Sequence, residues 1–469
     1  MLKFFNKYYP IRNLVFFILE SILIFFSIYS IILFFYNGSL PIHPYRLNIW
    51  IRISIVTIVL QVVLYYCSLY EFKYSFRIID LLLRIIQAIG ITCIILSAIY
   101  FLYPPAILEQ GIFFGGIVLL LFFLVSWRIL YIYLCQSGFW NEDIILIMDG
   151  ELGLHIINEI KSNLDSGYNI KYIFLPSTIK FNKEVLYDLS FKEDQIYQEI
   201  NRLCDIALEN DINKIIFALE EKRGVSPISK LLECKTKGIA IVDGVTFYEN
   251  LCGKVLVTKV VPSWLIFSEG FSRLKLKLLT KRVLDIIWSL FGLVVFSPML
   301  ILIAILVKLT SRGPVLFTQI RVGQWERPYK IYKFRTMRED AEKDGAKWAQ
   351  KDDPRITPIG GFLRRFRLDE TPQFFNVLKG DMSFVGPRPE RPEFVKQLKS
   401  KIPYYGERHC LKPGITGWAQ VNYPYGASEE DALKKLEYDL FYVKNMTILF
   451  DIYIILKTIK TVVTGQGAR

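Results

Sequence analysis

The chain has few of the residues that build metal centres and disulfide frameworks. It contains three histidines and seven cysteines in 469 residues, and no two cysteines have the Cys-x-x-Cys spacing. His409 has no other histidine or cysteine at ligand spacing, so we expect a hydrogen-bonded structural residue there. Several cysteines lie in apolar runs. We therefore expect buried free thiols rather than disulfides or metal ligands at Cys67, Cys93, Cys135, Cys204, Cys234, Cys252 and Cys410.

Two further signals are missing. A basic start precedes the first apolar run, but that run is too long for a cleavable signal and lacks a small-residue cleavage site, so we expect no cleavage. Motifs that read nucleic-acid bases are absent, and the excess cations stand close to apolar segments. The net charge of +13 therefore indicates an anionic membrane surface or phosphorylated ligands, and no nucleic acid.

Apolar residues are abundant and unevenly distributed. They make up 52% of the chain, whose mean hydropathy is +0.33. Over residues 1–139 we predict a four-helix transmembrane bundle. Its four stretches each approach the roughly 20 residues that a helix needs to cross a bilayer. They are residues 14–36, 48–70, 79–103 and 110–136.

The cations that flank these stretches predict the orientation of the chain. The loop Pro104–Gln110 carries none, and Arg46 with Arg52 blurs the pattern on that side. Most of the others precede the first stretch or lie between the second and third: Lys3, Lys7, Arg12, Lys73 and Arg77. Because basic loops stay in the cytoplasm, we expect the N-terminus, the second loop and everything after residue 137 on the cytoplasmic side.

Residues 140–267 alternate between apolar strands and helical patterns. This alternation predicts a small, doubly wound, Rossmann-like α/β domain. A dinucleotide fingerprint in the first turn would need a glycine at Met148, and Glu151 stands in the phosphate loop. We therefore expect a structural or regulatory domain rather than a nucleotide site. The predicted strands are Asp143–Met148, Ile170–Leu175, Lys214–Ala218 and Gly238–Val242.

The apolar segment Val283–Val307 allows two topologies. It is long enough to cross a bilayer once, and Asp285 is its single acid. A proline at Ser297-Pro298 kinks a helix. A re-entrant helix that is broken there would explain why both ends are basic, but an ordinary fifth span with a tolerated proline also fits. The basic residues at the ends are Lys281, Arg282, Lys308 and Arg312.

Two adjacent acids, Asp369 and Glu370, stand in a segment that suits a phosphate site. Thr371-Pro372 is typical of a first helical turn, so either acid is a candidate cap. A helix N-terminus should hold Asp369 ionised and able to attack phosphorus, with Glu370 and Asp369 as candidate Mg²⁺ ligands. A plain helix cap beside membrane-facing arginines is the alternative. The arginines upstream are Arg364, Arg365 and Arg367.

Four cations are candidate phosphate ligands. The proline-rich turn Gly386–Pro389 would present Arg388 at a fixed place, and a guanidinium group can fork phosphate oxygens. Arg364 can do the same. Lys333 and Arg335 could pair with phosphate or contact lipid headgroups. A structural turn with a solvated arginine is the alternative for Arg388.

Together these segments resemble the bacterial sugar transferase family, the monotopic phosphoglycosyl transferases. The resemblance covers about residues 278–469, and the whole layout looks like the large polyprenyl glycosylphosphotransferases. The segment Val421–Ser428 is similar to a subgroup linked to exopolysaccharide export. The motifs occur in the family's order: Lys281-Arg282 with Asp285, Ser297-Pro298, Gly313-Pro314-Val315, Lys333–Met337, Leu368-Asp369-Glu370-x-Pro372-Gln373, Gly386–Pro389 and Pro413-Gly414-x-Thr416-Gly417-Trp418.

The resemblance implies a mechanism for a catalytic domain at 268–469. A break at Ser297-Pro298 would make 283–307 a re-entrant helix. Asp369 would attack the β-phosphate of a UDP-sugar, release UMP and carry a covalent phosphosugar, which polyprenyl phosphate would then remove. Glu370 would hold Mg²⁺, and Arg364 and Arg388 would bind phosphate. The implied partners are the UDP-sugar, polyprenyl phosphate and membrane lipids, and a homodimer is also considered.

Two other classes of function are compatible with parts of the sequence. A polysaccharide-export scaffold with an inactive transferase domain would be expected to have lost the Asp-Glu pair, which is present. A glycosyl transferase that moves sugar without phosphate would release UDP instead of UMP. Glucose, galactose and N-acetylated amino sugars all fit as the transferred group, in exopolysaccharide, O-antigen or capsule synthesis.

Overall fold

The computed structural model divides the chain into two compact units. Apart from a short N-terminal stretch, one runs to Phe247 and the other from Tyr248 to the C-terminus. The predicted divisions at residues 139/140 and 267/268 remain predictions. Of the cations used to predict topology, Arg46, Lys73 and Arg77 lie outside the described residues. The structure describes residues 2–4, 7–9, 11–37, 47–70, 78–108, 110–138, 140–163, 166–176, 184–219, 227–260, 262, 271, 275–338, 341, 353–424, 426 and 428–463.

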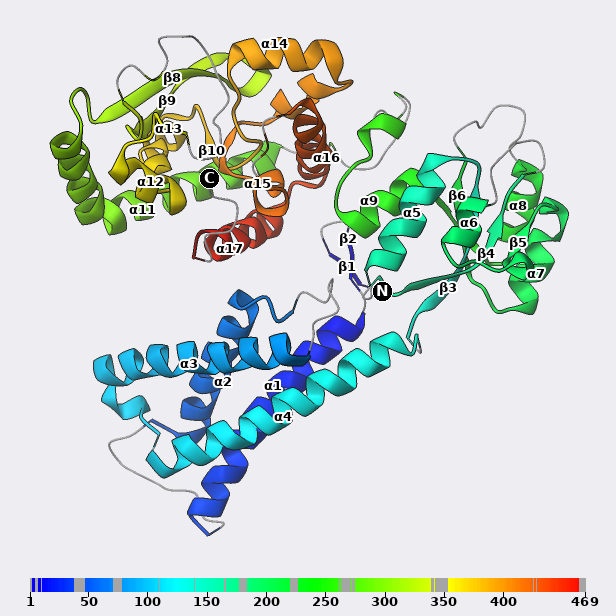
Figure 1. Cartoon of the computed structure of the whole chain (residues 1–469), viewed down its shortest axis with the longest axis horizontal. Coiled ribbons are helices and arrows are strands. Elements are labelled where there is room, and N and C mark those ends of the chain that lie inside the picture. The colour runs from blue at the N-terminus through cyan, green and yellow to red at the C-terminus, as the bar shows by residue number, and fades with distance from the viewer. Residues whose placement is uncertain are drawn as a thin grey trace. The chain divides into compact units, whose positions relative to one another are not determined.

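Four long apolar helices form the first part of the first unit (Figure 1). Helix α1 packs against α2 and α4, and α3 packs against the same two helices. Their bounds agree with the predicted stretches to within a few residues. They are α1 (Ile11–Phe35), α2 (Ile49–Tyr66), α3 (Ile78–Leu102) and α4 (Gln110–Gln136), with the short strands β1 (Leu2–Phe4) and β2 (Lys7–Tyr9) before them and the 3₁₀ turn η1 (Pro104–Ala106) after α3.

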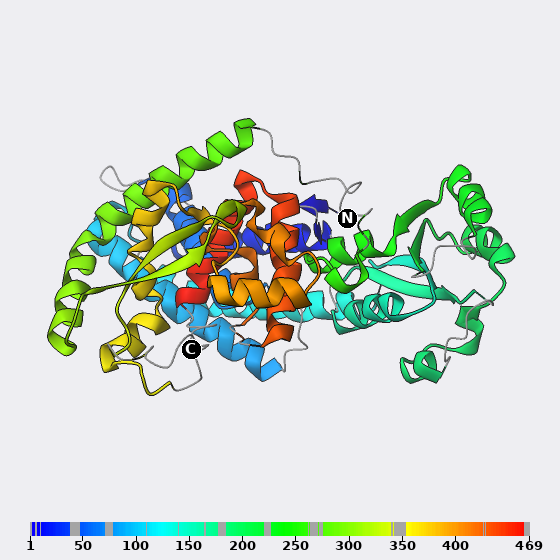
Figure 2. The same ribbon diagram turned by 90° about the horizontal axis from the view of Figure 1, so that it is seen from above.

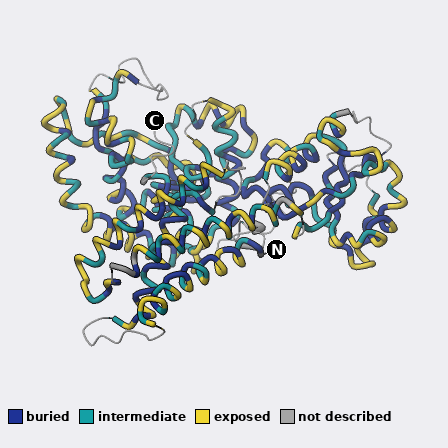
Figure 3. The backbone as a smooth tube through the Cα atoms, turned by 60° about the horizontal axis from the view of Figure 1, so that its bottom comes forward, coloured by how far each residue is buried: buried dark blue, intermediate teal, exposed yellow. Residues whose placement is uncertain are grey.

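These helices have apolar residues on their outer faces as well as inside. Ile24, Ile53 and Ile85 are fully buried between helices, whereas Phe34 and Phe101 are 79% and 86% exposed. Buried and exposed segments alternate along the helices (Figure 3). Among the described residues, five helices are long and apolar enough to cross a membrane: α1 to α4 and a helix of the second unit. An apolar outer face of this extent is typical of a membrane protein.

A five-stranded parallel sheet forms the α/β part of the first unit, in the order β5-β4-β3-β6-β7 (Figure 1). This is the strand order of a Rossmann-like sheet. The four predicted strands are confirmed, and the additional β5 has only two residues, too few to produce a periodic pattern. The strands are β3 (Glu142–Met148), β4 (Tyr168–Phe174), β5 (Ile196–Tyr197), β6 (Lys214–Ala218) and β7 (Ala240–Asp243). The helices and 3₁₀ turns are α5 (Glu151–Ser162), α6 (Glu184–Asp188), η2 (Glu193–Gln195), η3 (Ile200–Arg202), α7 (Leu203–Glu209), α8 (Ile228–Thr236) and α9 (Gly244–Cys252).

Closely packed side chains fill the space at the turn between β3 and α5. Met148 is fully buried at the end of β3. A Cβ atom on Gly153 would lie 2.5 Å from the Cβ of Met148, so only glycine allows α5 to come this close. The methionine side chain therefore fills the space that a glycine would leave open in a dinucleotide-binding turn.

One prediction about the cysteines is wrong. Cys204 of α7 and Cys234 of α8 form a disulfide, with their Cα atoms 5.3 Å apart. The two residues are 30 positions apart in the chain, and only the packing of α7 beside α8 brings them together. The other five cysteines are thiols, as predicted; Cys252 is buried, and the other four are half-buried.

The longest helix of the second unit is the 36-residue α11 (Lys275–Thr310). The backbone remains helical through Ser297 and Pro298, so the helix does not end at the predicted break. Figures 1 and 2 show that α11 changes direction along its length. The first half of α11 packs against α13 (Gln373–Lys379) and β10 (Ser383–Val385). Ile303 and Val307 in the second half pack in a small core with Phe334 and Leu363. Both ends of the helix therefore contact the same compact unit.

Two small sheets and several short helices complete the second unit. Strands β8 (Leu316–Val322) and β9 (Pro328–Phe334) form an antiparallel hairpin, and β10 pairs in parallel with β11 (Gly414–Thr416). The helices are α12 (Pro358–Arg365), α14 (Pro392–Lys401), α15 (Trp418–Asn422), α16 (Glu429–Asn445) and α17 (Ile448–Val463). The 3₁₀ turns are η4 (Val257–Lys259), η5 (Gln324–Glu326), η6 (Leu368–Glu370) and η7 (Tyr405–Cys410).

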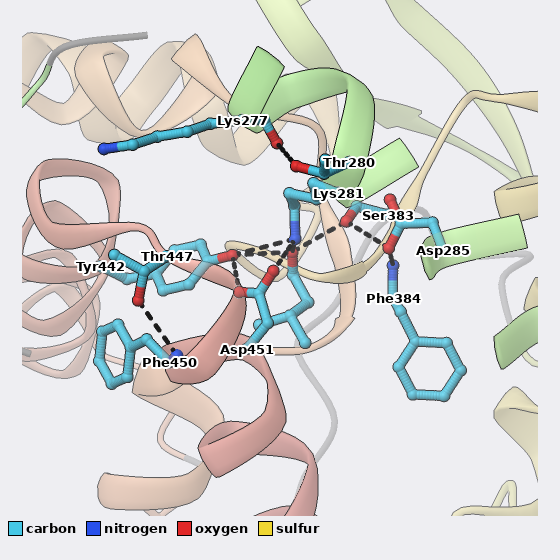
Figure 4. A network of polar contacts seen from close by, with 11 residues as sticks. Lys277, Thr280, Lys281, Asp285, Ser383, Phe384, Tyr442, Thr447, Phe450 and Asp451 are labelled. Carbon is cyan, nitrogen blue, oxygen red and sulfur yellow. Dashed lines mark hydrogen bonds and ion pairs between the residues drawn. The ribbon is translucent and has the colours of Figure 1, made fainter. Parts of the chain in front are cut away.

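A buried polar network ties the start of α11 to the rest of the unit (Figure 4). The Nζ of Lys281 lies 2.6 Å from Asp451 Oδ2 on α17 and 3.0 Å from the carbonyl oxygen of Val385. Asp285 accepts hydrogen bonds from the Ser383 hydroxyl and the Phe384 backbone N–H. A buried charge is stable only when it has hydrogen-bond or ion-pair partners. These contacts therefore fix the start of α11 against the rest of the unit.

Candidate active site

A cavity of about 520 Å³ lies within the second unit, and most of the residues predicted to carry chemistry line it. Lys333, Arg335, Arg364, Asp369, Glu370 and Arg388 all contribute to its wall. Eleven arginines and lysines line the cavity, against four acids, Asp369, Glu370, Glu390 and Asp439. Such an excess of positive charge in a partly enclosed site favours anionic ligands. Ser297 and Pro298 lie in the middle of α11 and do not line the cavity.

The hairpin and α13 bring Lys333 to the acid pair. Asn376 of α13 is fully buried, accepts a hydrogen bond from the Tyr332 backbone N–H and donates one to the Lys330 carbonyl oxygen. These two bonds hold β9 beside α13. Lys333, the next residue on β9, then donates to Glu370 Oε1 at 2.8 Å.

The acid pair lies in the 3₁₀ turn η6, not at a helix cap. Helix α13 begins at Gln373, with Pro372 in the N-cap position, so the prediction that Asp369 or Glu370 caps a helix is wrong. Arg367, directly before the turn, has the left-handed conformation, with φ of 53°. This conformation is costly for a residue with a side chain, and it persists where surrounding contacts enforce it.

Burial and neighbouring charges shift the pKa values of the two acids in opposite directions. Burial raises the pKa of Asp369 to about 6, against the opposing effect of Lys333. The expected lowering by a helix N-terminus does not occur, although the group is still mostly ionised at pH 7. Burial would also raise the pKa of Glu370, but the charges of Arg388, Lys333 and Arg367 outweigh it and hold that pKa well below its usual range. Glu370 is therefore a permanent anion.

Close contact between two glycine motifs positions Arg388. In the parallel pair β10–β11, a Cβ on Gly386 would lie 2.3 Å from the Lys412 carbonyl oxygen. A Cβ on Gly414 would lie 2.1 Å from the backbone nitrogen of Gly386. Both positions therefore require glycine. Just beyond this contact, Arg388 donates to Glu370 Oε1 at 2.8 Å.

The other two predicted cations have partners outside the acid pair. Arg364 Nε donates to Thr336 Oγ1 at 2.9 Å. Arg335 is 5% exposed, and its Nη2 donates to the carbonyl and hydroxyl oxygens of Ser311. Both residues line the cavity. Part of the hydrogen-bonding capacity of Arg335 is thus used by Ser311, whereas Lys333 and Arg388 contact Glu370 directly.

Two residues of the site, Gln420 and Arg408, could not be recognised from the sequence. Gln420 Oε1 accepts hydrogen bonds from Arg388 Nη1 at 2.8 Å and from Arg367 Nη1 at 3.3 Å. Arg408, which is buried, donates to the carbonyl oxygen of Arg388 at 2.9 Å and pairs with Asp439 at 2.7 Å. These partners in the site lie at least 20 positions away in the chain, so no local pattern marks the two residues.

The isolated histidine has a structural environment. His409 is 8% exposed, and burial lowers its pKa to about 4. Its ring lies edge-on to Tyr405, with centroids 6.1 Å apart. A neutral, buried imidazole that packs against a tyrosine agrees with the prediction of a structural residue, and neither His409 nor Cys410 lines the cavity.

Asp369 and Glu370 are suited to hold a metal ion whose remaining ligands come from a bound substrate. Across the described residues, no three His, Cys, Asp or Glu side chains cluster as metal ligands. Mg²⁺ needs fewer, because one or two carboxylates suffice when substrate phosphates and water complete the shell. Both cations bind Glu370 at Oε1, and within the described part of the chain no hydrogen bond reaches Oε2. The residues present therefore fit a magnesium ion.

Comparison with known proteins assigns the same region to one family. The family model described as "Bacterial sugar transferase" matches residues 276–465. The chain is 49% identical over 189 residues to a UDP-N-acetylgalactosamine-undecaprenyl-phosphate N-acetylgalactosaminephosphotransferase of Aeromonas hydrophila, covering 40% of this chain and 45% of that protein. It is 35% identical over 314 residues to a UDP-glucose:undecaprenyl-phosphate glucose-1-phosphate transferase of Klebsiella pneumoniae, covering 66% and 64%.

A shorter relative matches over almost its whole length. The exopolysaccharide production protein PSS of Rhizobium leguminosarum bv. phaseoli is 42% identical over 197 residues, which is 40% of this chain and 98% of that protein. The chain covers less than two thirds of the length of the Aeromonas and Klebsiella proteins. The candidate site lies within residues 276–465, the region that the family model matches.

Proposed function

We propose that this chain, which belongs to the bacterial sugar transferase family, transfers a sugar 1-phosphate from a UDP-sugar to polyprenyl phosphate. The cavity that combines Asp369 and Glu370 with eleven basic side chains is the observation that carries the proposal. Such a cavity suits two substrates that both carry phosphate. The names of the Aeromonas and Klebsiella relatives specify undecaprenyl phosphate and UDP-linked sugars.

The reaction proceeds in two displacements at phosphorus. A carboxylate oxygen of Asp369 forms a bond to the β-phosphorus, and the bond from that phosphorus to the bridging oxygen breaks. UMP leaves with the bridging oxygen and its electron pair, and the sugar phosphate stays on Asp369. An oxygen of polyprenyl phosphate then attacks the same phosphorus, which releases Asp369 and forms polyprenyl-diphosphate-sugar.

The neighbouring side chains neutralise charge during these steps. Lys333, Arg364 and Arg388 face Asp369 and would bind phosphate oxygens, with Arg335 on the same wall. Glu370, together with Asp369, would hold Mg²⁺. When bound, the ion would screen the charge of the diphosphate. The lowered pKa of Glu370 keeps this ligand ionised throughout the physiological range.

The proposal includes a location. The catalytic unit would lie on the cytoplasmic face of the inner membrane, with α11 entering and leaving the bilayer on that face. Three observations support this location: both ends of α11 contact the same unit, Pro298 lies inside the helix, and the helix changes direction along its length (Figure 2). The reaction would be the first membrane step of an exopolysaccharide, O-antigen or capsule pathway.

One assay tests the reaction. Purified full-length protein with polyprenyl phosphate, Mg²⁺ and a panel of UDP-sugars should release UMP with at least one sugar. UDP as the product would identify a glycosyl transferase instead, and no nucleotide release with any sugar would favour an export scaffold.

A second assay tests the covalent step. Without polyprenyl phosphate, labelled UDP-sugar should leave its label on a peptide that contains Asp369, in step with UMP. Asp369→Asn should remove the label and lower turnover on the order of 10³-fold or more. Label that appears only with the lipid present would indicate direct attack by the lipid phosphate.

A further inference from the structure

One amide oxygen holds two arginines at the edge of the acid pair. Gln420 Oε1 accepts from Arg388 Nη1 at 2.8 Å and from Arg367 Nη1 at 3.3 Å. An amide oxygen has two lone pairs, so both bonds can form together. Gln420 Nε2 is buried and, among the described residues, has no hydrogen-bond partner. The two guanidinium groups, which only donate, therefore decide which way the amide faces.

The arginines that Gln420 holds are the ones that surround Glu370. Arg388 also donates to Glu370 Oε1 at 2.8 Å, so its two terminal nitrogens are fixed by different acceptors. Arg367 lies next to the acid pair in the strained left-handed conformation. Its bond to Gln420 helps to keep it there.

The neutrality of Gln420 is the informative feature. A carboxylate at this position would accept the same two hydrogen bonds and form stronger, charge-assisted ones. It would also cancel one positive charge in a cavity whose cations serve anionic substrates. An amide fixes the direction of both guanidinium groups and adds no negative charge to the one that Glu370 already places beside Arg388.

Gln420 itself is held rigidly. It lies on the short helix α15, where Trp418 Nε1 donates to the carbonyl oxygen of Gly253 at 2.7 Å. Asn422 caps the same turn by donating to the Trp418 carbonyl oxygen, and Lys457 donates to Asn422. The amide oxygen is thus presented from a fixed backbone.

We propose that Gln420 is a positioning residue for the donor phosphates: it orients Arg388 and Arg367 without neutralising them, so that their charges remain available to the diphosphate. This role rests on the proposed function for the identity of the substrate. Gln420 would orient the guanidinium groups that recognise a diphosphate. Binding of a diphosphate can be measured without turnover.

The experiment compares two substitutions in the full-length protein. Gln420→Glu keeps the shape and the hydrogen bonds but adds a negative charge. Gln420→Met keeps the volume but removes the acceptor. Binding of inorganic pyrophosphate and of UMP, each with Mg²⁺, is measured by calorimetry, and kcat and KM are measured for the best UDP-sugar. Gln397→Glu, on the exposed face of α14, is the matched charge control.

The two variants should differ in which property they lose, pyrophosphate binding or kcat. Gln420→Glu should weaken pyrophosphate binding by about tenfold or more, because it pairs with the arginines that the anion needs. Gln420→Met should lower kcat more than it raises KM, because the charges remain but their orientation is lost. The control should bind as the wild type does.

Two outcomes would overturn the proposal. Wild-type pyrophosphate binding by Gln420→Glu would show that the neutrality of the residue is irrelevant. Equal losses in both variants, with equally lowered unfolding temperatures, would show a merely structural role. If no UDP-sugar is turned over by the wild type, the proposed function fails, but the pyrophosphate comparison still decides the role of Gln420.

Discussion

At the scale of single residues, Asp369 and Glu370 are neighbours with different tasks. Both are buried in the same turn, yet Glu370 has direct contacts with Lys333 and Arg388, whereas Asp369 forms no ion pair with any cation in the described part of the chain. The sequence predicted the pair and the cations around it, because acids, arginines and prolines in ordered motifs are visible in the chain. It could not predict Gln420 or Arg408, because their roles depend on partners that only the fold brings near.

The raised pKa of Asp369 predicts how the first half-reaction depends on pH. The attacking form is the carboxylate, and burial places the pKa at about 6. The label transferred to Asp369 in a single turnover should therefore be half-maximal near pH 6 and fall about tenfold for each pH unit below that value. Quenched single-turnover labelling without lipid measures this directly. A flat profile between pH 5 and 8 would contradict the assignment.

Substitution of Glu370 should affect the metal more than the nucleophile. Glu370→Gln removes the charge that would hold Mg²⁺ and leaves Lys333 and Arg388 without their ion-pair partner. We expect the Mg²⁺ concentration for half-maximal rate to rise by roughly tenfold or more, with chelator abolishing activity in both proteins. Glu393→Gln on the exposed face of α14 should behave as the wild type. An unchanged Mg²⁺ dependence would assign the metal elsewhere.

At the scale of elements, apolar periodicity predicted the helices of the first unit and four of the five strands. It could not predict β5, which is too short for any pattern, or the Cys204–Cys234 bridge, which follows from the packing of α7 against α8. It also overestimated the effect of Pro298. The helix continues through Pro298. A proline removes only one backbone donor, so the turns on either side can keep their own hydrogen bonds.

The network at the start of α11 makes a prediction about stability. Asp451→Asn leaves the Lys281 ammonium buried without an anion, and loss of one partner of a buried pair costs about 3–5 kcal/mol. The unfolding temperature in detergent should fall markedly. The double variant with Lys281→Met should recover much of the loss, as tested by a double-mutant cycle. Lys277→Met, whose side chain extends away from the network in Figure 4, is the control. Additive effects of Lys281 and Asp451 would contradict a coupled pair.

The closed turn after β3 predicts a negative result. Because Met148 is fully buried and packs against Gly153, the pyrophosphate of NAD or NADP has no room at this position. Calorimetric titration of the full-length protein should show no binding in the low-micromolar range, with a UDP-sugar titration as the check that the sample is active. Low-micromolar binding of either dinucleotide would refute this interpretation of the α/β region.

At the scale of the whole molecule, the distribution of charge and apolar surface makes one connected prediction about topology. A straight helix of 36 residues is about 54 Å long, more than enough to cross a bilayer. Yet both halves of α11 pack on one compact unit, and the segment between them is apolar and exposed. If α11 enters and leaves the bilayer on the same face, the basic residues at both of its ends stay on that face, and neither pair has to cross the membrane.

Reporter tags after Gly138 and after Arg469 should therefore both be cytoplasmic. Replacement of Pro298 by leucine restores a backbone donor and removes the ring that clashes with the preceding turn. The helix can then straighten, and part of the population should place the C-terminal tag on the periplasmic side. Ser297→Ala keeps the proline and should leave both tags in the cytoplasm. Cysteine accessibility in intact cells and spheroplasts measures each population. A periplasmic C-terminus in the unsubstituted protein would mean that α11 crosses the membrane and that the catalytic unit cannot meet a cytoplasmic UDP-sugar.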